Sequence, residues 1–142
     1  MRQQNMELLR AGAQSLGLYL ATEHVRAFQT YYRELTVWNR RFNLTTVTRY
    51  EDVQIKHFLD SLTCLLALPV PDASQSLRDL PNVIPLSRKE TALQCVDVGT
   101  GAGFPGLPLK IMRPSLQLTL LDSSRKKVMF LKHLVKSLGL SG

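Results

Sequence analysis

The apolar positions in the first part of the chain follow the period of a helix. They recur at spacings of three and four residues, at Val25, Phe28, Tyr32, Leu35 and Trp38. This spacing predicts an amphipathic helix, for which Thr22 is a suitable N-cap. A second helix, with Thr48 as a suitable cap, is predicted to end at Pro69, because proline cannot continue a helix. Its apolar positions are Val53, His57, Phe58, Leu62, Leu65 and Leu66.

The pattern changes near the end of the chain, where two short apolar runs occupy residues 93–98 and 116–121. A glycine-rich loop and a short helical stretch join them, which predicts a βαβ unit with parallel strands. Ser123 or Ser124 can cap a further helix that ends at Gly139. One face of this helix holds Val128, Leu131, Leu134 or Val135, and Leu138.

Prolines separate the two patterns. Pro69, Pro71, Pro81 and Pro85 lie among polar residues without regular periodicity, which is typical of a connector. The sequence therefore predicts an N-terminal helical region at 1–68, a connector at 69–92, and the first part of a Rossmann-like domain at 93–142. The fold class is α/β with an incomplete parallel sheet.

The composition limits the size of the core and the class of protein. The chain has 142 residues, of which 44% are hydrophobic and 20% charged, and this suits one modest core or two small ones. No apolar run is long enough to span a bilayer and no signal-peptide core follows Met1, so we expect a cytoplasmic protein. Cys64 and Cys95 lie in apolar surroundings, which favours small buried residues over a disulfide or a metal site.

The net charge of +7 is unevenly distributed. Residues 95–142 hold seven basic and two acidic side chains, whereas 1–68 hold eight and six. This distribution favours a polyanionic partner such as nucleic acid, although lysine-rich helix faces are often only solvated. Arg40 and Arg41 lie beside Trp38 and Phe42, an arrangement suited to phosphate contact or base stacking, or to a solvated helix end.

Residues 101–106 read Gly-Ala-Gly-Phe-Pro-Gly and match the pattern G-x-G-x-x-G. The match follows a predicted strand and precedes a helix, which is the context that a nucleotide-binding loop requires. Asp122 ends the next strand, about 20 residues further on, where a carboxylate can accept hydrogen bonds from two ribose hydroxyls. Both NAD and S-adenosylmethionine contain adenosine, so both fit these features.

Asp97 favours the second cofactor. It lies two residues before Gly99, where an anionic pyrophosphate would be repelled and where the ammonium and sulfonium of S-adenosylmethionine would be attracted. Pro105 points the same way, because it removes an N–H that a phosphate would use. The alternative is that Asp97 only caps a turn at the strand end.

Three separated blocks carry a resemblance to a known family: VWNRRFNLTTV, KHFLDSL and VDVGTGAGFPGLPLKIMRPSLQLTLLDSSRKKVMFLK. Together they resemble the bacterial glucose-inhibited division protein B family. Members of that family are S-adenosylmethionine-dependent methyltransferases that act on N7 of one guanosine in small-subunit ribosomal RNA. The resemblance covers the chain from about Tyr31 onward, except for the connector, which is longer than expected.

The resemblance implies a set of site residues. The cofactor-binding positions, with Asp97, are Gly99, Gly101, Gly103, Phe104, Asp122, Ser123 and Ser124. His57, Asp60 and Ser61 match an HxxDS block whose role the sequence does not give, and a half-buried helix histidine is an equal interpretation of His57. Arg40 and Arg41 are the candidate RNA contacts.

The reaction that the resemblance implies needs little from the protein. Guanine N7 presents an unprotonated lone pair, so no general base is required and no catalytic residue is assigned. The chain stops where a third strand would begin, so we expect a piece of a monomeric methyltransferase that is inactive alone. The expected uncovered apolar positions are Leu107, Leu109, Ile111, Val128, Leu131 and Leu138.

Two other classes remain open. One is an NAD-dependent oxidoreductase fragment, in which Asp97 would have to be tolerated beside pyrophosphate. The other is an RNA-binding or assembly module without catalysis, which the basic segment 95–142 favours. Cofactor binding separates the two from a methyltransferase.

Overall fold

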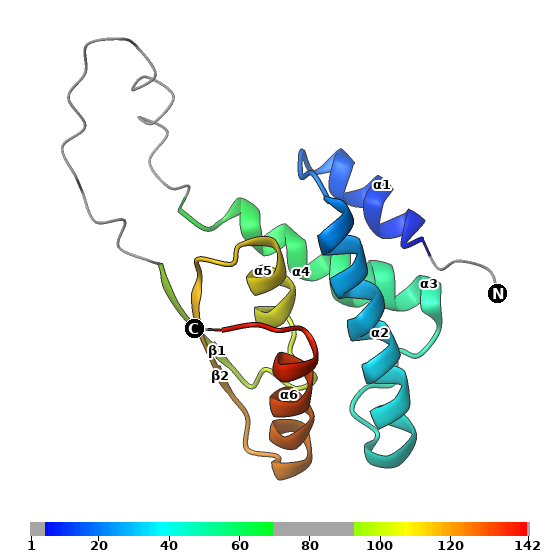
Figure 1. Cartoon of the computed structure of the whole chain (residues 1–142), viewed down its shortest axis with the longest axis vertical. Helices are drawn as coiled ribbons and strands as arrows, with labels where there is room; N and C mark the ends of the chain where they lie inside the picture. Colours follow the sequence, from blue (N-terminus) through cyan, green and yellow to red (C-terminus); the bar gives the residue numbers. More distant parts are fainter. Residues whose placement is uncertain (1–4, 70–92, 142) are drawn as a thin grey trace, which may run out of the picture.

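The computed structural model describes residues 5–69 and 93–141 (Figure 1). In chain order, the elements are α1 (Glu7–Ser15), α2 (Thr22–Phe42), α3 (Tyr50–Val53), the π-helical η1 (Gln54–Leu59), α4 (Asp60–Thr63), the 3-10 turn η2 (Cys64–Leu66), β1 (Gln94–Val98), α5 (Gly106–Met112), β2 (Gln117–Leu121) and α6 (Arg125–Ser137). Most of the predicted connector, residues 70–92, lies outside the described residues.

The predicted βαβ unit is confirmed. β1 and β2 form a two-stranded parallel sheet, with Asp97 opposite Leu120 and Val98 opposite Leu121. α5 connects them, and α6 follows β2 with Ser124 at its N-cap position and Gly139 in the left-handed conformation at its end. The described part of the chain is therefore mixed helix and strand, as a partial Rossmann-like fold requires.

The helical prediction for the first part of the chain is also confirmed, with shifts of one or two residues. α2 begins at Thr22 itself, so that Ala21 is the N-cap, and Arg49 rather than Thr48 precedes α3. On α2, Tyr31 is fully buried, whereas Tyr32 is only partly buried. The helical period allows either tyrosine to face inward, and packing selects Tyr31.

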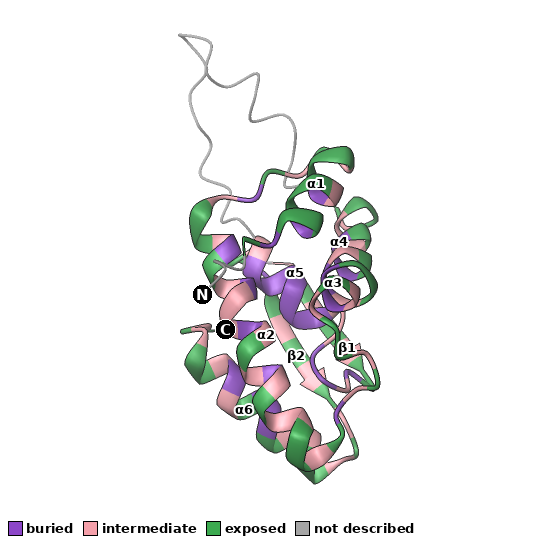
Figure 2. Ribbon diagram, turned by 90° about the vertical axis from the view of Figure 1, so that its right-hand side faces the viewer, coloured by how far each residue is buried: buried purple, intermediate pink, exposed green. Residues whose placement is uncertain are grey.

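The two parts of the chain share one hydrophobic core. α2 lies against both α5 and α6, and α4 also packs on α5 (Figure 1). The expectation of uncovered helix faces is therefore wrong for four of the six named positions: Leu107, Leu109, Ile111 and Leu131 are all buried. The N-terminal helices supply the cover that the small sheet cannot, and Figure 2 shows α5 as a buried element.

The uncovered apolar surface lies on the sheet instead. Every second residue of both strands is exposed, and these include Val96, Val98 and Leu121. Val98 is 77% exposed. The helices thus cover one face of the strand pair and leave the other to solvent (Figure 2).

The cysteine prediction needs correction. Cys64 and Cys95 are free thiols, and both are partly exposed rather than buried. Cys95 lies on β1 between two exposed positions, so the strand is covered on one side only. None of the helices in residues 5–69 and 93–141 is long and apolar enough to cross a membrane.

Candidate functional site

The glycine loop lies at the carboxyl ends of the two strands and is tied to the second of them. The amides of Gly99 and Thr100 donate to the carbonyl oxygen of Leu121, at 2.8 and 3.0 Å. Gly99 and Gly101 have φ values of 73° and 61°, which other residues rarely adopt. A Cβ built on either glycine would meet no atom within 4 Å, so the loop backbone is open to a ligand on that side.

Asp122 holds the loop from the end of β2. Its Oδ2 accepts a hydrogen bond from Gly101 N and its Oδ1 one from Ser124 N, both at 2.8 Å. The bond from Ser124 is the main reason that the pKa of Asp122 lies below its ordinary value. A carboxylate has about four acceptor positions, so Asp122 keeps capacity for ribose hydroxyls. Ser123, beside it, is exposed.

Asp97 caps α5, which is the alternative role that the sequence left open. Its Oδ2 accepts a hydrogen bond from Gly106 N at 2.9 Å, and a Cβ on Gly106 would lie only 2.8 Å from that oxygen. The first N–H of the helix is therefore not free for a phosphate. Oδ1 of Asp97 accepts no hydrogen bond within the described residues, so it remains available to a cationic group.

Phe104, in the glycine loop, stacks against the N-terminal helices. Its ring is nearly parallel to those of Tyr31 and His57, with centroids 5.2 and 4.3 Å away. The Tyr31 hydroxyl donates to the carbonyl oxygen of Ala102 at 2.7 Å. A Cβ on Gly103 would come within 2.5 Å of that hydroxyl, so the loop needs glycine there. Burial, with a smaller effect of Asp97, raises the pKa of Tyr31.

The stack places His57, the first residue of the HxxDS block, against the glycine loop. His57 lies in the π-helical turn η1, and its Nε2 is 2.8 Å from Thr45 Oγ1. Burial lowers the pKa of His57, so the ring that stacks on Phe104 favours its neutral form. Ser61 Oγ donates to the carbonyl oxygen of His57. No hydrogen bond of the Asp60 carboxylate to the loop is found in the described residues, although its charge acts on His57.

The candidate RNA contacts lie at the exposed end of α2. The Arg41 guanidinium carbon is 5.7 Å from the centre of the Phe42 ring, and Lys126 Nζ from α6 is 6.0 Å from the same centre. Trp38 packs on Phe42 with centroids 5.5 Å apart. Arg40, Arg41 and Lys126 form no ion pair with any described residue. The Phe42 ring is therefore close to cations from two helices.

The sequence missed two members of these clusters. Tyr31 was passed over in favour of Tyr32, because the helical pattern alone does not fix the rotation of α2. Lys126 was not distinguished from its basic neighbours, since its approach to Phe42 depends on how α6 packs on α2. No group of three or more His, Cys, Asp or Glu side chains that could hold a metal ion occurs in the described residues.

Two parallel strands, joined by a glycine loop and a helix and each carrying an aspartate at or next to its carboxyl end, are the first part of a Rossmann-like methyltransferase fold. The family model described as "GidB: rRNA small subunit methyltransferase G" matches residues 24–142. The chain therefore belongs to this family. Methyl transfer by such a family implies a methyl donor of the S-adenosylmethionine type.

Curated relatives agree with the family. The chain is 43% identical over 142 residues to a protein of Caldanaerobacter subterraneus. The matched region covers 100% of this chain and 52% of that relative. A protein of Dehalococcoides mccartyi is 44% identical over 96% of the chain and 50% of its own length. Both are named "Ribosomal RNA small subunit methyltransferase G". The chain spans about half the length of the curated relatives it matches.

Proposed function

We propose that this protein transfers a methyl group from S-adenosylmethionine to N7 of a guanosine in small-subunit ribosomal RNA. Membership of the family supports the reaction class. The observation that supports this cofactor over a dinucleotide is the position of Asp97. One of its carboxylate oxygens accepts the hydrogen bond of the first N–H of α5, and the other oxygen has no partner in the described residues. A pyrophosphate needs that N–H and avoids a carboxylate, whereas an ammonium is attracted to one.

The proposed cofactor residues are those that surround the open side of the glycine loop. Gly99 and Gly101 allow the close approach of backbone to ligand, Gly103 lets the loop pack closely against Tyr31, and Asp122 holds the ribose. Phe104, Ser123 and Ser124 complete the set. Phe104 is itself stacked on two rings, so its part in cofactor binding is to fix the loop conformation as well as to offer an apolar edge.

When bound, S-adenosylmethionine supplies an electrophilic methyl group on a sulfonium. The chain's own residues would orient the cofactor. Asp97 attracts its cationic end, Asp122 holds its ribose, and the carboxyl ends of the two strands fix the glycine loop between these aspartates. Guanine N7 needs no deprotonation, so positioning and electrostatics provide the catalysis and no general base is assigned.

The proposed RNA surface includes Arg40 and Arg41, and the geometry adds Lys126. Unpaired cations around an aromatic ring suit phosphate contact together with stacking on a base. Arg125, Lys126 and Lys127 occupy the first turn of α6, where the helix dipole disfavours positive charge, so an anionic partner would relieve them. We place the protein in the cytoplasm, as a monomer acting on ribosomal RNA.

Asp97→Asn tests the cofactor assignment. Asparagine keeps a carbonyl oxygen for Gly106 N, so the cap on α5 persists, but it replaces the free acceptor with an NH₂ donor. We expect the affinity for S-adenosylmethionine, measured by calorimetry on the whole chain, to fall about 10-fold or more, since a hydrogen bond to a charged group contributes about 1.5–3 kcal/mol. NAD should bind neither variant.

The control for this variant is its thermal unfolding, which should stay near that of the original chain because the bond to Gly106 is retained. Binding of NAD in place of S-adenosylmethionine would instead indicate an oxidoreductase. Retained RNA binding without cofactor binding would indicate a non-catalytic RNA module. Methyl transfer to unmodified small subunits tests the reaction itself. We expect it from a full-length relative and not from this chain alone, which spans about half of the relatives' length.

A further inference from the structure

Tyr31, on α2, reaches the glycine loop directly. The residue is 0% exposed, and its hydroxyl donates to the carbonyl oxygen of Ala102 at 2.7 Å. Its ring lies within 3° of parallel to that of Phe104. The cofactor-binding residues that the family resemblance implies do not include Tyr31. It nevertheless holds the loop both at the backbone and at a side chain.

The bond from Tyr31 fixes one peptide unit of the loop. The carbonyl oxygen of this unit belongs to Ala102 and is bonded on the α2 side. The N–H of the unit belongs to Gly103 and donates to the carbonyl oxygen of Thr100 at 2.9 Å. Rotation of the unit would therefore break two hydrogen bonds at once.

Without those bonds the unit would rotate easily, because glycine follows it. Gly103 has a φ of 101°, a value that glycine adopts and other residues rarely do. A peptide unit next to a glycine can take either of two orientations, as the common turn types show. In the other orientation the oxygen of Ala102 would leave Tyr31, and Gly103 would release Thr100. The turn from Thr100 to Gly103 would then open.

Tyr31 is suited to remain a hydrogen-bond donor. Burial raises the pKa of its phenol, and the negative charge of Asp97 adds a smaller effect in the same direction. The phenol therefore keeps its proton at neutral pH. The effect of Asp97 also means that Tyr31 lies within electrostatic reach of the carboxylate that we propose for the cationic end of the cofactor.

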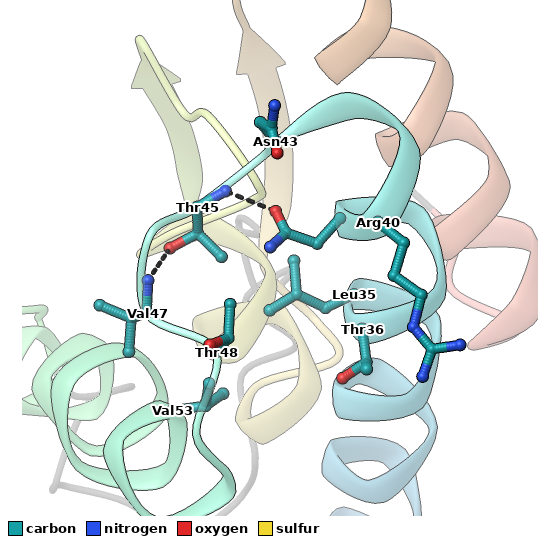
Figure 3. Close-up of a pocket in the computed structure, with 9 residues that line it drawn as sticks. Leu35, Thr36, Arg40, Asn43, Thr45, Val47, Thr48 and Val53 are labelled. Carbon is teal, nitrogen blue, oxygen red and sulfur yellow. Dashed lines mark hydrogen bonds between the residues drawn. The ribbon is translucent and has the colours of Figure 1, made fainter.

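The ring of Phe104 has a second attachment, which comes from the loop after α2. Figure 3 shows how this loop is bonded: Asn39 Oδ1 accepts from Thr45 N at 2.8 Å, and Thr45 Oγ1 accepts from Val47 N at 3.1 Å. Thr45 Oγ1 also lies 2.8 Å from Nε2 of His57, whose ring stacks on Phe104. The side chain of Phe104 is therefore held from two elements.

The backbone of the glycine loop lacks such a second attachment at Ala102. Within residues 5–69 and 93–141, the carbonyl oxygen of Ala102 accepts a hydrogen bond from Tyr31 and from no other group. Thr45 lines a pocket of about 320 Å³ beside α2 (Figure 3), but none of the described residues that line it belongs to the glycine loop. Tyr31 is thus the contact that sets the orientation of the loop backbone at Ala102.

We infer that Tyr31 is a positioning residue for the cofactor: its hydroxyl keeps the carbonyl oxygen of Ala102 turned toward α2 and so holds the glycine loop in the conformation that binds S-adenosylmethionine. The inference rests on the proposed function, because it concerns the same cofactor. It adds a residue of the N-terminal helices to a site whose proposed cofactor contacts all lie between Asp97 and Ser124.

Loss of the hydroxyl should lower the affinity for the cofactor. With the bond gone, the loop divides its population between the binding conformation and the rotated one. The apparent affinity then falls with the fraction of chains that remains competent to bind. The expected loss is about 5-fold, the factor that one net hydrogen bond contributes.

Tyr31→Phe removes only the hydroxyl and keeps the ring that stacks on Phe104. Tyr32→Phe is the matched control, because it makes the same change at a residue whose hydroxyl donates to the carbonyl oxygen of Thr48, at 3.4 Å, and not to the glycine loop. S-adenosylmethionine is titrated into each whole chain by calorimetry, well below the midpoint of thermal unfolding. We expect binding to be about 5-fold weaker in Tyr31→Phe and unchanged in Tyr32→Phe.

Hydrogen exchange without cofactor tests the loop itself. The amides of Gly103 and Phe104, which both donate to the carbonyl oxygen of Thr100, should exchange faster in Tyr31→Phe than in the original chain. The amide of Leu109, in α5, donates to the carbonyl oxygen of Pro105 and should exchange at its original rate. A general loss of stability would instead speed the exchange of all three amides.

Weaker cofactor binding together with faster exchange confined to the loop amides supports the inference. Equal affinity of Tyr31→Phe and the original chain overturns it, even when the loop amides exchange faster. An equal loss of affinity in Tyr32→Phe, or faster exchange of all three amides, also overturns it. Failure of the original chain to bind S-adenosylmethionine contradicts the proposed function and this inference together, whereas failure of the inference alone leaves that binding intact.

Discussion

At the scale of single residues, several polar side chains of this protein are fixed by backbone partners rather than by other side chains. Asp97 and Asp122 accept from loop and helix amides, and Tyr31 donates to a loop carbonyl. Lys110 is only 3% exposed, and its Nζ donates to the carbonyl oxygens of Pro114 and Leu116 at 2.7 and 2.6 Å. These bonds hold the turn between α5 and β2.

Lys110→Met should therefore destabilise the fold although it preserves the apolar stem. Two carbonyl oxygens lose their donor, and leaving a buried polar group unpaired costs about 1–3 kcal/mol. We expect the free energy of unfolding in urea at pH 7 to fall by about 2 kcal/mol. Lys132→Met, at an exposed position of α6, is the control and should change it by less than about 0.5 kcal/mol. Equal stability of both variants would contradict this role.

At the scale of elements, the N-terminal helices and the glycine loop meet through aromatic rings. α2 contributes Tyr31 and η1 contributes His57, and both stack on Phe104. His57 belongs to a π-helical turn, a distortion that often marks functional sites. The loop that we propose to bind the cofactor thus depends on elements from the other end of the chain.

This contact predicts a pH dependence. Burial lowers the pKa of His57 in the native state from its ordinary value of 6.5. A hydrogen bond to the backbone of Lys56 and the negative charge of Asp60 act in the opposite direction but are smaller effects. The unfolded chain then binds more protons, so the stability of the loop contact should fall as the pH drops through about 6.5. Hydrogen exchange of the amides of residues 99–104 and Gly106, corrected for intrinsic rates, should become faster as the pH is lowered from about 7.5 to about 5.5.

His57→Phe keeps an aromatic ring but cannot titrate, so its loop exchange should not vary with pH in this range. His24→Gln, in the first turn of α2, removes a different histidine and should keep the original pH dependence. A His57→Phe chain that still loses protection on acidification would assign the effect to another group.

At the scale of the whole molecule, charge and apolar surface are distributed unequally. The chain has a net charge of +7, and the cations around Phe42 come from two helices that are far apart in sequence. The open face of the sheet is instead uncharged: it exposes Val96, Val98 and Leu121 together with the polar residues Gln94, Gln117 and Thr119. The basic cluster is the surface suited to RNA phosphate.

Salt dependence tests this distribution. Each phosphate contact contributes about 0.7 to the slope of log affinity against log salt for single strands. We expect Arg41→Met to weaken binding to ribosomal RNA and to flatten this slope by about that amount. Arg26→Met makes the same change of charge at another exposed position of α2 and should keep the slope. Identical slopes for the two variants would remove Arg41 from the RNA surface.

The sequence alone predicted most of the elements and the position of the glycine loop between the two strands. Periodicity predicted α2, the helical turns from Tyr50 to Leu66, both strands and α6, because local spacing decides which face of an element is apolar. It did not predict α1 (Glu7–Ser15). The glycines and the two aspartates were found in the same way, since a strand-loop-helix turn has a local pattern. The family resemblance, carried by short blocks of adjacent residues, was found from the sequence and confirmed by the family match.

Only the tertiary structure decided which residues meet across the chain. Tyr31 and the carbonyl of Ala102 are 71 positions apart in sequence, and Glu34 and His133 are 99 apart. No local pattern encodes such contacts, because they depend on how α2 rotates and where α5 and α6 dock against it. For the same reason the cover over α5, the stack on Phe104 and the pocket beside Thr45 could be seen only in the folded chain.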